Sequence, residues 1–226
     1  MRKLVSVSTE PTKNINELIA YSNQLFGVAD FMHCDVMDKD FVGRELLSVE
    51  DIKVLNQNCG TMLDVHLMTK NLKQKCYDYI DAGANILTVH FESFQNKAEL
   101  VKTLENIQKK HALAGISFNP DTNLNQVLPF LKYCNLVLVM SVVPGKSGQK
   151  FITETYEKIK TIKQYIQKNN LNILLEVDGG ITPEISQELF KCGADMIVSG
   201  SFVYKNDDKK SAISLLKNNN LLTAKK

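Results

Sequence analysis

Eight short apolar runs, separated by longer stretches with a different spacing, constrain the fold of this chain more than any other feature. The runs lack strict alternation of apolar and polar residues, which is typical of strands buried on both faces of a parallel sheet. In sequence order they are LVSVS, FMHCDV, MLDVHLM, ILTVHF, LAGISF, LVLVMSV, NILLEV and MIVSGSF.

The stretches between these runs have the apolar spacing of helices, and several end in Gly, Asn or a basic residue, as helix C-termini commonly do. Examples are NINELIAYSNQLF, LKQKCYDYIDAG, AELVKTLENIQKKHA and TYEKIKTIKQYIQKNN. Strands that alternate with helices predict an α/β protein with a parallel sheet.

The length of the chain favours one architecture within this class. Eight units in 226 residues leave about 28 residues for each unit, close to the size of a compact βα repeat. No linker rich in Pro, Gly or Ser divides the chain. We therefore expect residues 1–226 to form a single-domain (β/α)8 TIM barrel. A doubly wound open sheet has the same alternation and is the alternative.

Charge and cysteine content argue against several classes of partner and site. The formal net charge is +2 and the lysines are scattered, which indicates no nucleic-acid or membrane partner. The five cysteines form no CxxC pair, so we expect neither a disulfide framework nor a thiolate zinc site. MRKLVSVSTEPT has no apolar core of a signal peptide, and the most apolar stretch, 136–143, is too short to cross a bilayer. We expect a cytoplasmic protein.

Polar residues interrupt the apolar runs near their C-terminal ends. In a barrel, this end of the strands carries the βα loops that build active sites, so residues distant in sequence are expected to converge there. The polar residues are His33 and Asp35 in the second run, Asp64 and His66 in the third, His90 and Glu92 after the fourth, Asn119 after the fifth, Ser141 after the sixth and Asp178 after the seventh.

Four of these residues form a candidate metal site. A single histidine at a strand end is more often a hydrogen-bonded structural residue than a ligand, but four ligand-type side chains at one end of a barrel point to a cation. Two imidazoles and two carboxylates suffice for one divalent ion. Zn²⁺ is the first expectation, and Fe²⁺, Mn²⁺ or Co²⁺ suit the same donors. The four residues are His33, Asp35, His66 and Asp178.

Small-residue turns follow the last three runs. They are VVPGKSGQKF, VDGGI and VSGSF. Such turns let backbone N–H groups point at an anion, and barrels frequently hold a phosphate after strands seven and eight. Each glycine alone is explained by a tight turn, but three such turns at one end of the barrel predict a phosphate site.

A metal site beside a phosphate site suggests a phosphorylated small molecule whose other end binds the cation. Two carboxylates at that site suit a general acid and a general base. The combination indicates proton transfer at a carbon beside a carbonyl, where positive charge stabilises an enediolate oxygen.

Six motifs, spread in order between residues 33 and 204, resemble the ribulose-phosphate 3-epimerase family. They are HCDVMDKDFV, DVHLM, VHFES, VMSVVPGKSGQKF, VDGGI and VSGSFVY. The resemblance implies a (β/α)8 barrel that interconverts D-ribulose 5-phosphate and D-xylulose 5-phosphate. It also implies one divalent metal ion, a small phosphorylated ketose as substrate, and a homo-oligomer, either a dimer or a hexamer.

The motif positions imply specific roles. Asp35 and Asp178 take the places of the acid/base pair, one on each face of the C3 centre, and also of two metal ligands. His33 and His66 take the other ligand places, and His66 is also an expected substrate contact. Ser8 falls on a strand-one serine that contacts substrate in the family; Ser6 points to the same face and is a rival.

The remaining implied substrate contacts are methionines beneath the sugar and turns around the phosphate. For the methionines, plain core packing is the alternative. The methionines are Met37, Met68 and Met140, and the turn residues are Gly145, Lys146, Ser147, Gly148, Gly179, Gly180, Gly200 and Ser201.

Three departures from the family pattern fall around the substrate. Lys39 stands where a glycine usually follows DVMD, and Gly43-Arg44 replace a Pro-Asn pair. GFGGQ is GKSGQ here, and the PSIL of strand one is VSTE. Because these changes touch the rim, the same chemistry on a hexulose phosphate such as D-allulose 6-phosphate is an alternative. A non-catalytic phosphosugar-binding homologue and a metal-free synthase barrel are further alternatives, against which the two aspartates and two histidines argue.

Overall fold

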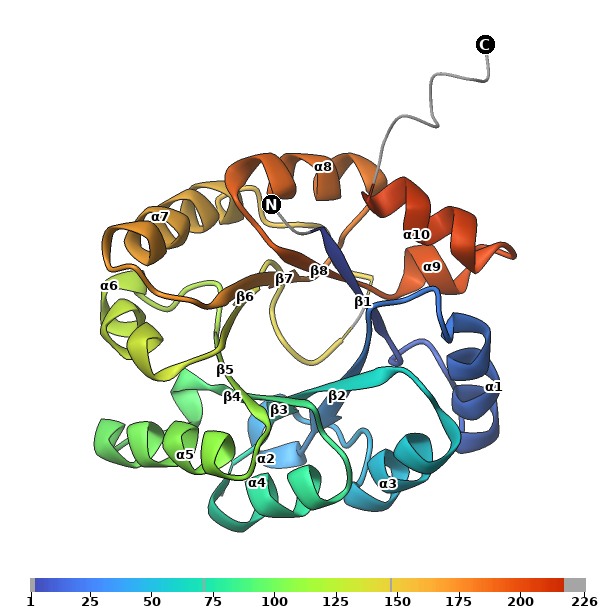
Figure 1. Cartoon of the computed structure of the whole chain (residues 1–226), viewed down its shortest axis with the longest axis horizontal. Coiled ribbons are helices and arrows are strands. Elements are labelled where there is room, and N and C mark those ends of the chain that lie inside the picture. Colours follow the sequence, from blue (N-terminus) through green and yellow to red (C-terminus); the bar gives the residue numbers. More distant parts are fainter. Residues whose placement is uncertain (1–2, 71, 147, 218–226) are drawn as a thin grey trace.

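The computed structural model describes residues 3–70, 72–146 and 148–217 and closes eight parallel strands into one barrel (Figure 1). Each strand pairs with the next in sequence, and β1 pairs with β8. This confirms the (β/α)8 barrel and excludes the open doubly wound sheet. The strands are β1 (Leu4–Ser8), β2 (Phe31–Met37), β3 (Met62–Met68), β4 (Ile86–His90), β5 (Leu113–Phe118), β6 (Leu136–Met140), β7 (Leu174–Asp178) and β8 (Met196–Ser199).

Helices surround the barrel and connect successive strands (Figure 1). The α-helices are α1 (Ile15–Leu25), α2 (Lys39–Val42), α3 (Val49–Asn58), α4 (Leu72–Asp81), α5 (Lys97–Lys109), α6 (Leu124–Val127), α7 (Thr155–Lys168), α8 (Pro183–Cys192), α9 (Ser201–Tyr204) and α10 (Lys209–Lys217). Within the described residues, the 3₁₀ segments η1 (Phe91–Ser93) and η2 (Leu128–Tyr133) follow β4 and α6.

Local sequence signals fix several helix ends. Ser48 and Asp51 form a reciprocal capping box at the start of α3. The side chain of Thr182 caps α8, and Pro183 in the first turn has the backbone angle that a helix needs. Gly193 ends α8 in the left-handed conformation. The α8 boundaries therefore follow directly from the sequence.

Each strand divides its side chains between two environments. On β2, Met32, Cys34 and Val36 belong to the apolar core between the sheet and the helices. Phe31 lies on the other face of β2 and joins a smaller apolar cluster inside the barrel. The other buried members of that inner cluster are Ile86, Leu136, Leu138, Met140, Val142, Met196 and Val198. Both faces of the strands are thus buried, as the lack of strict alternation predicts.

Polar side chains share the barrel interior with this inner cluster. A buried charge is costly unless it is paired and hydrogen-bonded, so such residues require partners inside the barrel. The fully buried polar residues that occupy inward positions on the strands include Ser6, His33, Asp64, His66, Thr88, His90, Ser117 and Glu176.

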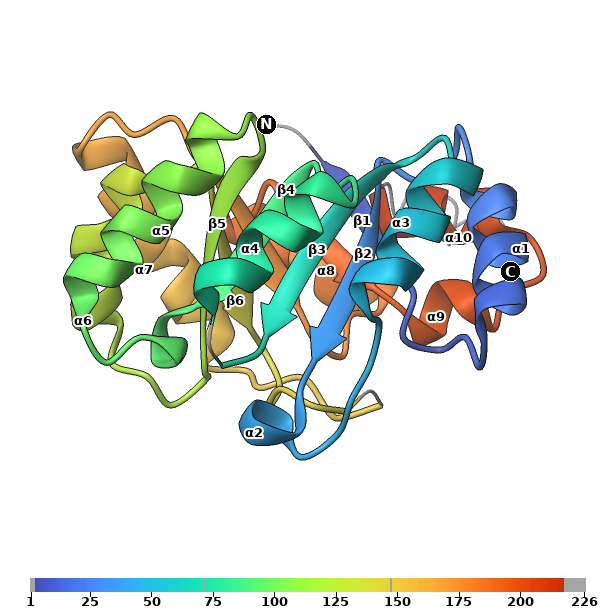
Figure 2. The same cartoon turned by 90° about the horizontal axis from the view of Figure 1, so that it is seen from below.

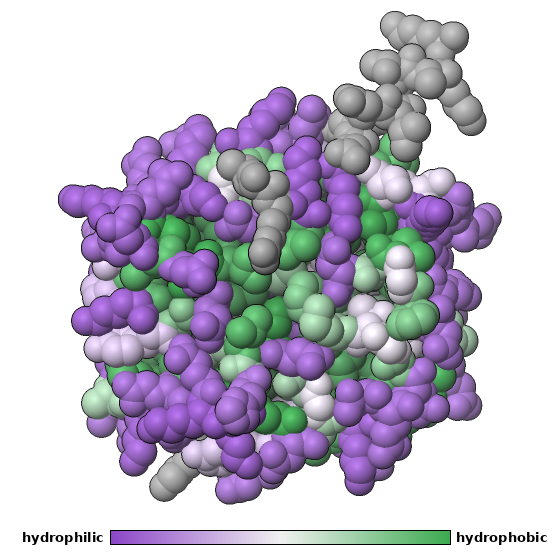
Figure 3. Space-filling view, in the orientation of Figure 1, coloured by the Kyte–Doolittle hydropathy of each residue, from purple (hydrophilic) through white to green (hydrophobic). Residues whose placement is uncertain are grey.

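The two ends of the barrel differ. The arrows of β2 and β3 point toward the end at which α2 and the long loop after β6 lie (Figure 2). At the start of β3 and β5, Met62 and Leu113 are 51% and 40% exposed. In the view of Figure 3, hydrophobic residues gather near the centre and hydrophilic residues surround them. None of the helices in the described ranges is long and apolar enough to span a membrane.

Candidate active site

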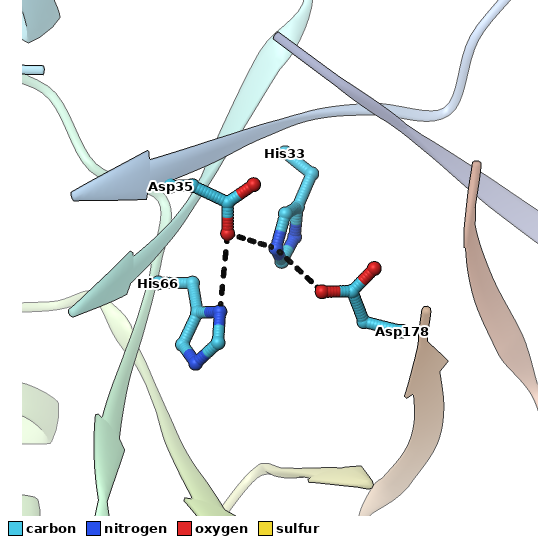
Figure 4. A group of neighbouring side chains, drawn as sticks. All are labelled: His33, Asp35, His66 and Asp178. Carbon is cyan, nitrogen blue, oxygen red and sulfur yellow. Dashed lines mark ion pairs between the residues drawn. The ribbon is translucent and has the colours of Figure 1, made fainter. Parts of the chain in front are cut away.

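The four predicted metal ligands converge at the carboxyl end of the barrel (Figure 4). Pairing of β2 with β3 places Asp35 opposite His66. The Oδ1 atom of Asp35 lies 3.3 Å from Nε2 of His33 and 3.3 Å from Nδ1 of His66. Oδ2 of Asp178, from β7, lies 3.9 Å from Nε2 of His33. One donor atom from each residue lies within 4.8 Å of the others.

Three of these donor atoms have no hydrogen-bond partner although they are buried. They are His33 Nε2, Asp35 Oδ1 and His66 Nδ1. Unsatisfied buried polar atoms are rare because each costs about 1–3 kcal/mol. All three point at one another, so a single divalent cation would satisfy them together. The residues present therefore fit the predicted metal site.

The other ring nitrogen of His33, Nδ1, contacts a buried carboxylate on the side away from the candidate metal site. This nitrogen lies 2.6 Å from Oδ2 of Asp64, and the hydroxyl of Ser6 donates to the same oxygen at 2.9 Å. Ser6 is therefore a hydrogen-bond partner of the buried Asp64 carboxylate. Ser8 instead lines the pocket described below, and its hydroxyl donates to Oδ2 of Asp35 at 3.3 Å.

Glu176 completes this buried layer and was not predicted from the sequence. Burial and the nearby Asp64 charge raise the pKa of Glu176 well above its usual range. This shift favours the neutral form of Glu176, in which the carboxyl group can act as a hydrogen-bond donor. Its position on the face of β7 that also carries Asp178, two residues away, is the signal that could have identified it.

The two expected acid/base residues differ in protonation in the metal-free site. Burial raises the pKa of Asp178 to about 7, and the charges of Asp35 and Asp64 add to this effect against the attraction of His33. Burial also opposes ionisation of Asp35, but its close interactions with His33 and His66 outweigh burial and hold the pKa of Asp35 below its usual range. At neutral pH, Asp35 is ionised and Asp178 is partly protonated.

A cavity of about 920 Å³ opens above these carboxylates. The predicted residues that line it are Ser8, Asp35, Met37, Met68, Met140, Gly145, Lys146, Gly148, Asp178, Gly179, Gly180, Gly200 and Ser201. Ser147 lies outside the described residues. His66 is fully buried and does not line the cavity. The structure thus separates His66 from the predicted substrate contacts and keeps it among the metal-ligand candidates.

The turns around this cavity are tied to one another. The hydroxyl of Ser141 lies 2.7 Å from the backbone oxygens of both Asp178 and Gly179. The amide of Gln149 donates to the backbone oxygens of Val143 and Lys146. Ser141, at the end of β6, is therefore hydrogen-bonded to the turn after β7, and Gln149 is hydrogen-bonded to two other residues of the loop after β6.

Two departures from the family pattern, Arg44 and Lys39, differ in their relation to the cavity. Arg44 donates to Oε1 of Glu10 at 2.7 Å, and Glu10 lines the cavity. Lys39 is exposed, its Nζ lies 3.4 Å from Oε2 of Glu45, and it is not among the residues that line the cavity. Lys205, which also lines the cavity, was not predicted; its position directly after the VSGSFVY motif is the signal that could have identified it.

Comparison with known proteins identifies the family. The sequence model of the ribulose-phosphate 3 epimerase family matches residues 6–204. The ribulose-phosphate 3-epimerase of Aquifex aeolicus is 36% identical over 191 residues, which cover 84% of this chain and 85% of the relative. The ribulose-phosphate 3-epimerase of Chlamydia muridarum is 37% identical over 181 residues, covering 79% of this chain and 78% of the relative.

Solved structures of other phosphosugar enzymes share the fold. The 3-keto-L-gulonate-6-phosphate decarboxylase of Vibrio cholerae superposes with a TM-score of 0.73 at 11% identity and covers 96% of both chains. At this identity the likeness concerns the barrel alone. The family match and the curated relatives go further, and by them this chain belongs to the ribulose-phosphate 3-epimerase family, an epimerase family that acts on carbohydrates.

Proposed function

We propose that the protein is a metal-dependent 3-epimerase that inverts C3 of D-ribulose 5-phosphate to give D-xylulose 5-phosphate. The observation that carries this proposal is the pair Asp35 and Asp178, which reach the floor of one cavity from different sides of the barrel and differ in pKa. Inversion at carbon needs one group to remove a proton and a second group to return a proton to the opposite face.

In the proposed reaction, ionised Asp35 removes the C3 proton and protonated Asp178 donates a proton to the other face of the enediolate. The reverse reaction exchanges the two roles. When bound by His33, His66 and both aspartates, a divalent cation supplies positive charge that acidifies the C–H bond beside the ketone. Coordination lowers the basicity of a carboxylate, and we expect the acidification of the substrate to outweigh this loss.

The rest of the cavity suits a phosphorylated ketose. We propose that backbone N–H groups of the three glycine turns bind the phosphate, and that the charge of Lys146 adds to the attraction. Ser8, which donates to Asp35, is placed to contact the sugar as well. The three sulfur-containing side chains of Met37, Met68 and Met140 line the same cavity and would pack against the apolar face of the sugar.

The proposal also covers the bound metal ion, the oligomeric state and the cellular location of the protein. Zn²⁺ is our first expectation, with Fe²⁺, Mn²⁺ or Co²⁺ as alternatives, since all suit imidazole and carboxylate donors. Elemental analysis of the purified protein identifies the ion. A homo-oligomer is expected and light scattering tests it. All five cysteines are free, which is consistent with a reducing cytoplasm.

The assay is conversion of ribulose 5-phosphate in D₂O by the metal-loaded protein. We expect xylulose 5-phosphate to form with deuterium at C3, because Asp35 removes the original proton while Asp178, whose proton has exchanged with D₂O, delivers a deuteron to the opposite face. A metal-loaded protein that binds the sugar phosphate but neither converts it nor exchanges its C3 proton would instead be a non-catalytic phosphosugar-binding protein.

A hexulose phosphate is the second candidate substrate, and a carboxylate at the rim of the cavity supports it. Glu10 presents a carboxylate to the cavity and is held there by Arg44. Such a carboxylate can accept hydrogen bonds from additional sugar hydroxyls. Turnover of ribulose 5-phosphate and allulose 6-phosphate, measured on the same preparation, distinguishes the two. A larger kcat/KM for the hexulose phosphate would replace the first proposal.

A further inference from the structure

A chain of hydrogen bonds leads from His66 away from the cavity. Nε2 of His66 lies 2.9 Å from Nε2 of His90, and Nδ1 of His90 lies 3.1 Å from Oε2 of Glu92. Both imidazoles are fully buried, and their rings stack with centroids 4.9 Å apart. Oε1 of Glu92 accepts from the backbone N–H of Asn119 and from the hydroxyl of Thr122. His66 thus has a built support that the proposed reaction does not use.

The far end of this chain fixes the direction of its hydrogen bonds. Burial disfavours the charged form of Glu92, but its hydrogen bonds with His90, Thr122 and Asn119 outweigh burial and lower its pKa to about 2. An ionised carboxylate only accepts, so Nδ1 of His90 carries a proton. In the imidazole tautomer with its proton on Nδ1, Nε2 of His90 is the acceptor, so Nε2 of His66 donates to it. The lone pair of His66 is left on Nδ1, the atom that faces Asp35.

We infer that His90 and Glu92 are positioning residues, which keep the proton of His66 on Nε2 and so leave Nδ1 free to bind a divalent cation. This inference rests on the proposed metal-dependent function, for which His66 is a ligand. Nδ1 of His66 is buried without a hydrogen-bond partner and lies 3.3 Å from Oδ1 of Asp35. Two lone pairs held at this distance repel each other unless a cation lies between them.

His33 has a corresponding support with the opposite nitrogen. Asp64 contacts Nδ1 of His33 at 2.6 Å, which leaves Nε2 facing the site. The two histidines therefore present different nitrogens to the same point, and a separate carboxylate sets each one. Outer partners of this kind orient metal-binding histidines, and their loss typically lowers metal affinity by about 10–100-fold.

Glu92→Gln tests the inference without changing side-chain volume. Two donors, the N–H of Asn119 and the hydroxyl of Thr122, hold the Oε1 position, so the carbonyl oxygen of the new amide stays there. The amide NH₂ group then faces Nδ1 of His90, which must accept. Nε2 of His90 becomes a donor to His66, and the proton of His66 moves to Nδ1, where it opposes a cation.

Two measurements report this change. The ¹⁵N chemical shifts of His66, recorded on the metal-free protein at mildly alkaline pH, should indicate an Nε2–H tautomer in the wild type and an Nδ1–H tautomer in Glu92→Gln. The dissociation constant for Zn²⁺, from competition with a chelator, should rise by about 10–100-fold. His90→Asn removes the acceptor of His66 and should weaken Zn²⁺ binding to a similar extent.

Thr88→Val is the matched control. Thr88 is fully buried on the inward face of β4, two residues before His90, and its hydroxyl has no hydrogen-bond partner. This variant should retain both the tautomer of His66 and the Zn²⁺ affinity. An unchanged tautomer in Glu92→Gln, or a Zn²⁺ affinity within twofold of the wild type in both Glu92→Gln and His90→Asn, would overturn the inference.

The two proposals fail in different ways. A wild-type protein that binds none of Zn²⁺, Fe²⁺, Mn²⁺ and Co²⁺ would refute metal-dependent epimerisation, whereas the metal-free ¹⁵N shifts would still decide whether Glu92 sets the tautomer of His66. Conversely, normal turnover with an unchanged tautomer in Glu92→Gln would refute the positioning role alone.

Discussion

Gly180 is the position at which the structure most sharply predicts the effect of one added methyl group. Gly180 has a φ of +64°, and a Cβ there would lie 2.8 Å from the backbone nitrogen of Phe151 and 2.9 Å from the backbone oxygen of Gln149. Ordinary contacts begin at 3.4 Å. In Gly180→Ala, the backbone at 149–151 must therefore move by about 0.6 Å. This is an overpacking effect, and the hydrogen bonds of the loop after β6 oppose the movement.

Gly27→Ala is the matched control for this variant. Gly27 has a φ of +72° and no atom within 4 Å of an added Cβ. Both substitutions place an alanine in the left-handed conformation, which costs about 1–2 kcal/mol. Only Gly180→Ala adds the collision, for which overpacking typically costs about 1–3 kcal/mol. We expect the free energy of unfolding to fall by about 1–2 kcal/mol in Gly27→Ala and about 2–5 kcal/mol in Gly180→Ala.

Urea unfolding of the metal-free proteins, followed by circular dichroism, measures the difference. The KM for ribulose 5-phosphate should rise in Gly180→Ala, because the displaced backbone belongs to the rim of the cavity, and should not change in Gly27→Ala. Equal losses of stability in the two variants would refute the reasoning, since it assigns the excess to the contact with Phe151 and Gln149 alone.

Three further outcomes are expected. Asp178→Asn should lower kcat by at least about 10²-fold, as loss of a general acid–base group does, and should stop the formation of deuterated xylulose 5-phosphate, which mass spectrometry after chromatographic separation of the two sugars detects. Zn²⁺ affinity should rise with pH, because protons on two proposed ligands compete with the metal. Burial raises the pKa of Asp178 to about 7; for His33, burial acts against the charged form, but the carboxylates of Asp64 and Asp35 outweigh it and raise the pKa well above its usual range. Below about pH 7 the affinity should therefore fall by at least about tenfold per pH unit, and a pH-independent affinity between pH 5 and 7 would contradict the assignment. Thr182→Ala should reduce the free energy of unfolding by about 1 kcal/mol through loss of the α8 cap, with kcat unchanged; a loss below the error of urea titration would show that the cap contributes nothing.

The barrel could be predicted because its signals are local and repeated. Eight apolar runs separated by helical spacing determine the order of the elements, and the position of polar residues at the ends of those runs determines the end of the barrel at which His33, His66 and Asp178 meet. Parallel pairing then brings Asp35 opposite His66. These features depend on residue type and spacing, which a sequence displays.

The supports of the site could not be predicted from the sequence. Glu176 lies within an apolar strand, and its raised pKa depends on burial inside the closed barrel and on the charge of Asp64 from another strand. The ion pair of Glu10 with Arg44 joins residues 34 positions apart across the rim. The sequence shows Glu92 as a polar residue after a strand, but its link to His66 through His90 depends on side-chain directions within the closed barrel. Such contacts arise only after closure.

The division of β2 into an outward and an inward face has a consequence for sequence divergence. Met32, Cys34 and Val36 pack against helices, while His33 and Asp35 alternate with them and point into the barrel. Substitutions of the first set alter helix packing, and compensating changes can be made in the helices without moving the second set. On β2, the positions that pack against helices can therefore be substituted independently of the positions that form the candidate site.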